Sequence, residues 1–227
     1  MGVLEDKDRA RLFYKYLSRV YDRVNPFVWT DEMRDETIAI LDVAADDRVL
    51  DVGCGTGFAT EGLLDEVEEV HGIDQSPHQL AQAYPKFGKH GAVRFHLGDA
   101  ERLPFRNDAF DVVWSSGSIE YWPDPVATLR ELCRVARPGG QVLVVGPNEP
   151  AGRLQRALAN AMMLFYTESE AQRMFENAGF ADVRHRLLGP DYAPTIAIAT
   201  LARVPTETES VGETVGETDA EPVGAED

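Results

Sequence analysis

The sequence predicts an α/β fold, with one mostly parallel sheet and helices on both of its faces. From residue 48 onward, short apolar runs alternate with helix-length segments, which is the pattern of βαβ units. A glycine-rich turn follows the first of these runs, where such folds bind ligands. The chain has 227 residues, 44% of them hydrophobic, so it can form one domain with a sizeable core.

Residues 1–43 are predicted to form an N-terminal helical segment that covers the domain. Aromatic residues are spread along its first half, and Asn25 and Pro26 interrupt it. Thr30, followed by Asp31 and Glu32, is typical of a capped helix start whose first turn matches the helix dipole. We therefore expect a second helix to begin at this point.

Seven strands are expected in the main domain, residues 44–204. Five apolar runs alternate with helices, at residues 48–53, 69–74, 93–98, 110–115 and 141–146, and two more follow at 181–188 and 195–204.

Three helices between these strands have clear boundary signals. Ser76, Pro77 and Gln79 predict a capping box, and Thr167 with Glu170 predicts another, for a helix that stops at Gly179. Asp124 and Pro125 open a helix that is expected to run to Arg137, where residues 138–140 end it.

The charge balance is strongly acidic. The chain has 22 basic and 39 acidic residues, for a net charge of −17, and only four of the basic residues are lysine. Phosphate backbones and anionic membranes repel such a chain, so no nucleic-acid partner is expected. Strong acidity with little lysine suits concentrated salt and predicts a halophilic source. Residues 205–227 carry eight acidic residues and no basic one, and we expect a disordered acidic tail there.

Metal and redox sites are not expected. Cys54 and Cys133 lie far apart without a C-x-x-C motif, and the five histidines form no ligand pattern. The sequence shows no signal peptide and no apolar run long enough to span a membrane, so we expect a cytoplasmic, reduced protein.

The strongest local motif is the turn after the first strand, where Asp51 precedes Gly53, Gly55 and Gly57. Glycines allow sharp turns and a close approach of the backbone to a ligand. The dinucleotide fingerprint fails because Phe58 stands where its third glycine would be. An acidic residue that opens the loop favours a cationic ligand, although a tight turn without a ligand would leave the same pattern.

Two further carboxylates stand at the ends of the next two strands. Asp74 ends the second strand, where α/β folds place an acid that accepts hydrogen bonds from ribose hydroxyls. Asp99 follows the third strand at the same edge of the sheet. Each alone is more often a turn residue, but three strand-end carboxylates around one glycine loop indicate a ligand site.

These motifs lead to a family resemblance. The segments VLDVGCGTGF, GIDQS, GDAERLPF, FDVVWSSGSIEYW and RVARPGGQVLVV resemble the class I S-adenosylmethionine-dependent methyltransferases. Within that class, residues 12–190 resemble the 2-methyl-6-phytyl-1,4-benzoquinol methyltransferases. The segments LSRVYDRVNPFVWTDEMRDE, DQSPHQLAQA, SGSIEYWPDP and MMLFYTESEAQRMFENAGFADVRHRLLGP carry that narrower resemblance. Those enzymes methylate a ring carbon of prenylated quinols.

The resemblance implies a Rossmann-like fold that binds S-adenosylmethionine, with Asp74 on the ribose and Asp99 at the adenine. The cofactor-binding residues that it implies are Asp51, Gly53, Cys54, Gly55, Gly57, Asp74, Gln75, Asp99, Ala100 and Ser115. The halophile-like composition favours a respiratory quinol, such as demethylmenaquinol or menaquinol, over a tocopherol precursor. Such a substrate is lipophilic, so at most peripheral contact with the inner face of the membrane is expected.

The substrate side of the site is less specific. Glu120 is our candidate for the base that takes a phenolic proton, with Tyr121 beside it, although Glu120 could instead cap or salt-bridge the following helix. The residues predicted to contact the quinol are Tyr14, Tyr21, Trp29 and His78; a core-packing stripe or a surface position would explain them as well. Residues 157–166 could receive the isoprenoid chain or touch a bilayer, or form a core helix.

Two other functions stay open. The same fold could methylate oxygen or nitrogen of a different small molecule, which the SGSIEYWPDP segment disfavours. A non-catalytic cofactor-binding module is also conceivable, but such a module need not keep an intact glycine loop and three placed carboxylates.

Overall fold

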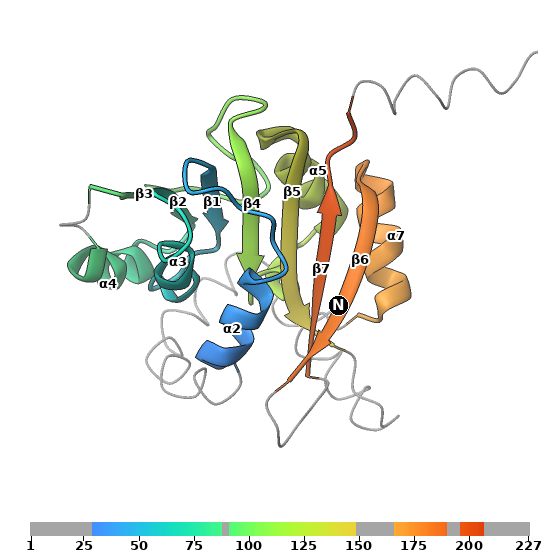
Figure 1. Ribbon diagram of the computed structural model, residues 1–227, viewed down its shortest axis with the longest axis horizontal. Coiled ribbons are helices and arrows are strands. Elements are labelled where there is room, and N and C mark those ends of the chain that lie inside the picture. The colour runs from blue at the N-terminus through green and yellow to red at the C-terminus, as the bar shows by residue number, and fades with distance from the viewer. Residues whose placement is uncertain (1–28, 88–90, 149–165, 190–195, 207–227) are drawn as a thin grey trace, which may run out of the picture.

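A computed structural model describes residues 29–87, 91–148, 166–189 and 196–206 of the chain. Its centre is a seven-stranded sheet with the strand order β3-β2-β1-β4-β5-β7-β6 (Figure 1). The strands are β1 (Arg48–Val52), β2 (Glu69–Asp74), β3 (Val93–Leu97), β4 (Phe110–Ser116), β5 (Ala136–Pro147), β6 (Ala181–Leu188) and β7 (Ala197–Arg203). The predicted α/β fold is confirmed.

The first five strands run parallel, and β7 is antiparallel to both β5 and β6. After β1 the chain builds outward through β2 and β3, and then returns to place β4 on the other side of β1. The strand order therefore reverses between β1 and β4. In open α/β sheets ligands bind outside the carboxyl ends of the strands at such a reversal.

The helices are α2 (Asp31–Ile38), α3 (Phe58–Leu63), α4 (Pro77–Phe87), α5 (Pro125–Val135) and α7 (Glu168–Ala178), with a short 3₁₀ helix, η1 (Ile119–Tyr121). Thr30 caps α2 by accepting a hydrogen bond from the Met33 amide, as predicted. Thr167 and Glu170 form the predicted capping box of α7, and Gly179 ends that helix in the left-handed conformation.

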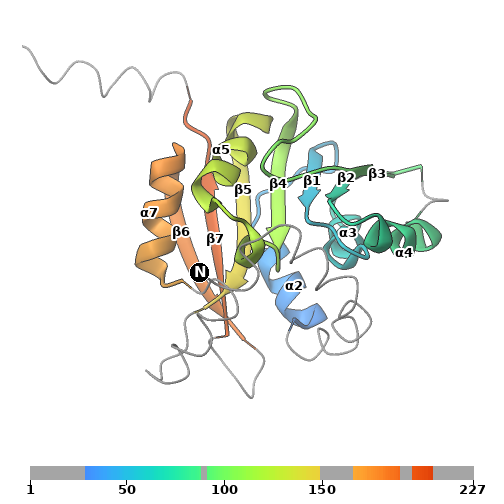
Figure 2. The same cartoon turned by 180° about the vertical axis from the view of Figure 1, so that it is seen from behind.

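Two hydrophobic clusters hold the helices to opposite faces of the sheet, because neighbouring strand residues point to opposite sides. On one face Val113 and Val142 pack with Leu129 of α5 and Phe175 of α7. On the other face Val112, Trp114 and Leu143 pack with Met33 of α2 and Leu63 of α3. Figure 2 shows α5 and α7 on the side toward the viewer, with α2 and α3 behind the sheet.

The prediction that the helix after Asp124 runs to Arg137 was wrong. The helix ends at Val135, and β5 already begins at Ala136. Ala136 pairs with Phe110 and Gln141 pairs with Val112, so the residues between them form an irregularity in the ladder. Gly139 adopts a φ of +74°, and its amide donates to the Val204 carbonyl oxygen. Residues 138–140 thus lie inside a long strand and do not separate a helix from it.

Several predicted segments lie outside the described residues. They include the helical segment before residue 29, most of the apolar run at 157–166, and the acidic tail from residue 207. The boundaries of the predicted N-terminal segment and tail stay predictions. No helix in the described part of the chain is both long enough and apolar enough to cross a membrane.

Candidate active site

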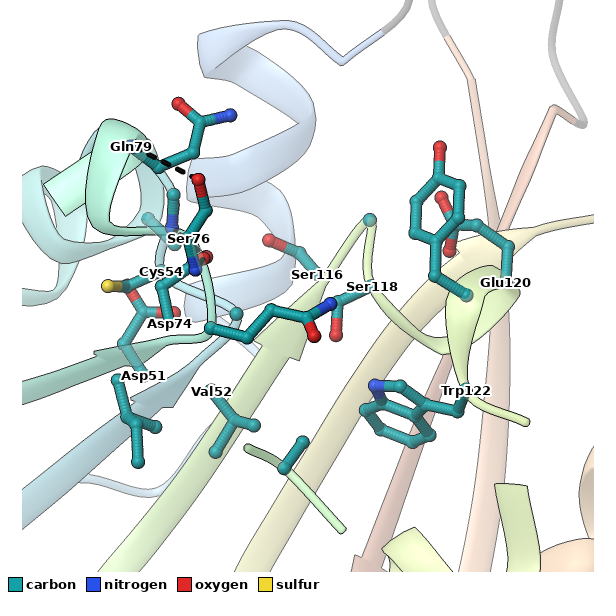
Figure 3. A pocket seen from close by; sticks show the side chains of 18 of the residues that line it. Asp51, Val52, Cys54, Asp74, Ser76, Gln79, Ser116, Ser118, Glu120 and Trp122 are labelled. Atoms are coloured by element: carbon teal, nitrogen blue, oxygen red, sulfur yellow. Dashed lines mark hydrogen bonds between the residues drawn. The ribbon is translucent and has the colours of Figure 1, made fainter. Parts of the chain in front are cut away.

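A cavity of about 730 Å³ opens where the strand order reverses, at the carboxyl ends of β1, β2, β4 and β5. Asp51, Cys54 and Asp74 lie on one side of it, and Ser118, Glu120 and Trp122 lie on the other (Figure 3). The glycine loop after β1 and the segment after β4 therefore face each other across one space. The sequence motifs that predicted a site come together here.

The glycine loop needs glycine at its first and last positions. Gly53 has a φ of +73°, and a Cβ there would lie 2.7 Å from the Ser118 Cβ. Gly57 has a φ of +89°, and a Cβ there would meet the Phe87 ring at 2.4 Å. Both positions favour glycine through the left-handed backbone and through lack of space. The loop thus runs close to the segment after β4, with Gly55 between these two positions and also lining the cavity.

Asp74 ties the end of β2 to this loop. Its Oδ2 accepts from the Gly55 amide at 2.9 Å, and its Oδ1 accepts from the Ser76 amide at 2.7 Å. Burial raises the pKa of the Asp74 carboxyl, and these two backbone hydrogen bonds oppose that rise. Each oxygen retains a further lone pair for a ligand hydroxyl. Gln75, the next predicted residue, also lines the cavity.

Asp51 is a buried carboxyl at the base of the cavity. It is 1% exposed, and the Thr60 hydroxyl donates to its Oδ2 at 2.6 Å. Burial raises the pKa of Asp51 to about 7; the Thr60 hydrogen bond opposes the rise, and the Asp74 charge adds to it. Burial also raises the pKa of the neighbouring Cys54 thiol, with the charges of Asp51 and Asp74 adding to the effect, so Cys54 stays a neutral thiol.

The predicted capping box at Ser76 is only half formed. The Gln79 amide donates to the Ser76 Oγ at 3.3 Å, as in a capping box. The Ser76 amide, however, donates to Asp74 and not to the Gln79 side chain. Asp74 therefore takes the bond that Gln79 was expected to accept, and the Gln79 Oε1 is buried without a partner on the cavity wall.

Asp99 and Ala100 line the cavity after β3, as predicted. The Asp99 Oδ1 accepts from the Glu101 amide at 3.1 Å.

Arg134 and Glu131, two residues of α5, hold the loop that follows Asp99. Arg134 donates to the carbonyl oxygens of Leu103 and Phe105, and Glu131 Oε2 accepts from the Leu103 amide. This pair leaves no local signal in the sequence, because it lies about 30 residues from the loop that it holds.

The prediction that Ser115 contacts the cofactor was wrong. Its side chain is fully buried beneath the cavity, where its hydroxyl donates to the Val52 carbonyl oxygen at 2.8 Å. The next residues, Ser116 and Ser118, line the cavity instead. Residue alternation along β4 explains the difference, since Ser115 points into the sheet's packed face. Ser115 supports the site indirectly, because its Oγ lies 3.1 Å from the Ser118 Oγ.

Glu120 and Tyr121 lie in η1, directly after β4, and both line the cavity. Glu120 is 9% exposed, and its Oε2 is buried without a hydrogen-bond partner. Burial raises its pKa to about 7, against a backbone hydrogen bond that lowers it. The alternative role as a helix cap is wrong, because the Asp124 side chain accepts from the Ala127 amide and caps α5.

The predicted substrate residues fall in two groups. Trp29 lines the cavity with a buried indole nitrogen that has no partner, and His78 lines it as an exposed residue at the start of α4. Tyr14 and Tyr21 lie outside the described residues. Trp122 also lines the cavity, although sequence analysis assigned it no role.

The cavity fits S-adenosylmethionine better than a phosphate-containing cofactor. Beside the glycine loop, Asp51 supplies a buried carboxyl and Asp74 a half-buried one, while the described lining residues include no lysine or arginine. A sulfonium and an ammonium group are favoured by such a wall, and a pyrophosphate is not. Asp74, Asp99 and Ala100 all line the cavity, and their expected contacts with the ribose and the adenine stay predictions.

The fold and this site are those of the class I S-adenosylmethionine-dependent methyltransferases, and the chain belongs to that family. The family model described as "Methyltransferase domain" matches residues 50–144. S-adenosylmethionine is the methyl donor of this family.

The chain is also similar to individual named proteins, several of them plant methyltransferases. The chain is 46% identical, over 83% of its length, to 2-methyl-6-phytyl-1,4-hydroquinone methyltransferase 2 of Oryza sativa, and covers 55% of that protein. It spans little more than half the length of the plant relatives. It is 31% identical to demethylmenaquinone methyltransferase of Bacillus licheniformis, over 65% of this chain and 66% of that one.

A solved structure agrees on the fold. A chain from the solved complex between the Haloferax volcanii Trm112 methyltransferase activator and a methyltransferase superposes on this protein with a TM-score of 0.74 at 21% identity. The match covers 87% of this chain and 98% of that chain. At this level of identity the likeness concerns the fold alone.

Proposed function

We propose that this protein transfers a methyl group from S-adenosylmethionine to a ring carbon of a prenylated quinol, and that the ring is that of demethylmenaquinol or menaquinol. The relatives support a quinol, because the plant and bacterial proteins just described are named for methyl transfer to a hydroquinone and to demethylmenaquinone. The acidic composition supports work in concentrated salt, in the cytoplasm, with at most peripheral membrane contact.

The observation that carries the proposal is the Glu120 carboxyl. It is buried in the cavity wall, one of its oxygens has no partner, and its pKa is about 7. A carboxyl with that pKa is ionised in about half of the molecules at neutral pH, which suits a general base. It faces the same cavity as the glycine loop, so a proton acceptor and the cofactor site share one space.

The chemistry follows from this arrangement. A ring carbon of a quinol becomes strongly nucleophilic when the neighbouring phenol loses its proton, but a phenol has a pKa near ~10. Glu120 takes that proton within the cavity, while the walls hold the ring in line with the donor. Such alignment removes roughly 7–11 kcal/mol from the barrier. When bound, S-adenosylmethionine would supply the methyl group: its S–CH3 bond breaks as the ring carbon bonds the methyl, and S-adenosylhomocysteine is left. The methylated ring carbon then loses its hydrogen to solvent as a proton, which restores the aromatic ring, and the proton on Glu120 returns to the phenolate oxygen.

Replacing Glu120 with glutamine tests the proposed base. Glu120→Gln preserves shape and removes basicity, so we expect cofactor affinity to hold and methylation of a demethylmenaquinol to fall by roughly 10²–10⁴-fold at neutral pH. The deficit should shrink as the pH rises toward the phenol's own pKa, because solvent then supplies the phenolate. Methyl transfer is measured by mass spectrometry from pH 6 to 9.5, with the exposed Glu66→Gln as the matched control.

Two results would contradict the proposal at different points. Full activity of Glu120→Gln at pH 7 would show that another group, or water, accepts the proton. Absence of methyl transfer from the unchanged protein to any prenylated quinol would refute the quinol substrate itself.

A further inference from the structure

Arg34 is a buried arginine between α2 and α3, which lie side by side (Figure 1). It is 7% exposed, and arginine is rarely buried to this extent without partners. Its Nε lies 2.8 Å from Asp35, and its Nη1 lies 3.3 Å from Asp31 and 3.7 Å from Glu61. All three carboxylates are exposed, so an exposed arginine could pair with them equally well. The ion pairs alone therefore do not explain why this guanidinium is buried.

Phe58 is the contact that only the buried position gives. The Arg34 Nη1 donates to the Phe58 carbonyl oxygen at 3.2 Å, and the guanidinium carbon lies 4.9 Å from the centre of the Phe58 ring. A planar guanidinium can lie over an aromatic ring and donate to an oxygen at the same time, whereas a compact ammonium lacks this geometry. Arg34 thus holds both the backbone and the side chain of one residue.

Helix α3 leaves space for the guanidinium at Gly62. A Cβ at Gly62 would lie 2.6 Å from the Arg34 Nε and 2.8 Å from the Ile38 Cδ1. Glycine weakens a helix interior, but a larger residue here would displace the Arg34 side chain. The sequence of α3 thus accommodates the contact between Arg34 and Phe58, although glycine makes the helix itself less stable.

Phe58 connects this contact to the cavity. It directly follows Gly57, the last glycine of the loop, and it is half-buried in the cavity wall. Trp29, shortly before the start of α2, lines the same cavity, whereas Arg34 does not. The guanidinium therefore acts on the cavity from behind its wall, where it joins the two helices that begin at these aromatic residues.

We propose that Arg34 is a positioning residue of the cofactor site, and that it fixes Phe58, and with it the end of the glycine loop, against S-adenosylmethionine. The Phe58 ring forms an apolar wall beside the cofactor, and the bond to the Phe58 carbonyl oxygen holds the start of α3. This inference goes beyond the proposed function and does not depend on a quinol, since it concerns cofactor binding alone. Met33 and Ile38 pack α2 onto the sheet, so α2 does not need Arg34 to stay in place.

The test is a double-mutant cycle on cofactor binding. The variants of the full chain are Arg34→Met, Arg34→Lys, Phe58→Leu and the combination of Arg34→Met with Phe58→Leu, and thermal unfolding checks that each is folded. Calorimetry measures the dissociation constant of S-adenosylhomocysteine, so the readout needs neither methyl transfer nor a substrate. Arg48→Met is the matched control, because the Arg48 guanidinium lies 5.4 Å from the ring of Phe110, a core residue that does not line the cavity.

Arg34→Met and Phe58→Leu should each weaken binding of S-adenosylhomocysteine by roughly 3- to 10-fold, the range for one cation–π contact or hydrogen bond. The combined variant should lose much less than the product of the two single effects, because Arg34 acts through Phe58. Arg34→Lys should lose nearly as much as Arg34→Met, although it keeps a charge for Asp31 and Asp35. Arg48→Met should bind like the unchanged protein.

Four results would overturn the inference. In the first, folded Arg34→Met binds S-adenosylhomocysteine with unchanged affinity. In the second, the two single effects multiply in the combined variant, so that Arg34 acts independently of Phe58. In the third, Arg34→Lys keeps full affinity, so that the ion pairs suffice. In the fourth, Arg48→Met weakens binding as much as Arg34→Met, so that the loss is a general one.

These measurements stand apart from the proposed function. A protein that methylates no prenylated quinol but shows the expected cycle loses the quinol substrate and keeps Arg34 as a positioning residue. A protein that methylates a quinol but shows any of the four results keeps its substrate and loses only this role of Arg34.

Discussion

Asp74 has two tasks at the scale of a single residue. It accepts from the amides of Gly55 and Ser76, and so shapes the glycine loop and the start of α4. It also lines the cavity where a ribose is expected. Removing it therefore takes away a ligand contact and the anchor of the loop together.

Asp74→Ala should weaken binding of S-adenosylmethionine by on the order of 2–3 kcal/mol, because charge-assisted hydrogen bonds are lost. Calorimetry on the folded variant measures this. Asp111→Ala is the matched control, since the Asp111 side chain also accepts a hydrogen bond from a backbone amide, that of Arg48, but does not line the cavity. Unchanged affinity in folded Asp74→Ala would remove Asp74 from the cofactor site.

Part of the site was predictable residue by residue. Asp51 and Asp74 lie near the carboxyl ends of β1 and β2, and Asp99 follows β3, so the strand pattern placed all three at one edge of the sheet. Gln79 was not predictable as a cavity residue, because its spacing from Ser76 equally predicts a capping box. Only the competition from Asp74 for the Ser76 amide, a contact within the folded turn, leaves Gln79 without its expected partner.

At the scale of elements, α5 holds the loop after β3. Arg134 and Glu131 bond to each other and to the backbone of Leu103 and Phe105, so they set the position of the segment that begins with Asp99. The Arg134 guanidinium also lowers the pKa of Glu131, which keeps that carboxylate charged.

Arg134→Gln should weaken cofactor binding by several-fold to tenfold, because the loop loses its charged anchor. Hydrogen exchange at residues 99–107 should speed up while that of β4 stays slow. Arg130→Gln on the same helix is the control, since Arg130 bonds to the Asn177 carbonyl oxygen and not to the loop. Equal exchange in Arg134→Gln and the unchanged protein would show that the loop needs no such anchor.

The elements themselves were largely predictable. Strands and helices with strong apolar runs and clear caps, such as β2 and α7, begin and end where the sequence indicates. The start of β5 was not predictable from the sequence, because Pro138 and Gly139 normally end regular structure. Here pairing with Phe110 and with Val204 keeps the segment in the sheet, and such long-range partners leave no local signal.

At the scale of the whole molecule, buried ionisable groups act on stability in opposite directions. Asp51 and Glu120 have a pKa raised to about 7, so the folded protein binds their protons more tightly than the unfolded chain does. Their effect lowers stability as the pH rises from about 4 to 7. Burial lowers the pKa of His71 and His96, so their effect lowers stability as the pH falls below about 6.5.

Glu120→Gln should therefore be more stable than the unchanged protein at pH 8, by up to roughly 3 kcal/mol, and about equal to it at pH 4.5. The ionised carboxylate carries the burial penalty, and glutamine does not. Thermal unfolding at both pH values measures the difference. A gain of equal size at pH 4.5 and pH 8 would mean that protonation of Glu120 is not linked to folding.

The acidic wall of the cavity also bears on how a catalytic cycle ends. Asp51 and Asp74 face a space whose described lining includes no lysine or arginine, so this part of the wall attracts positive charge. The sulfur of S-adenosylmethionine is positively charged, and that of S-adenosylhomocysteine is neutral. Methyl transfer removes that positive charge, so we expect these carboxyls to attract the spent cofactor less strongly than the fresh one. On electrostatic grounds, the same carboxyls should therefore favour exchange of the spent cofactor for a fresh one.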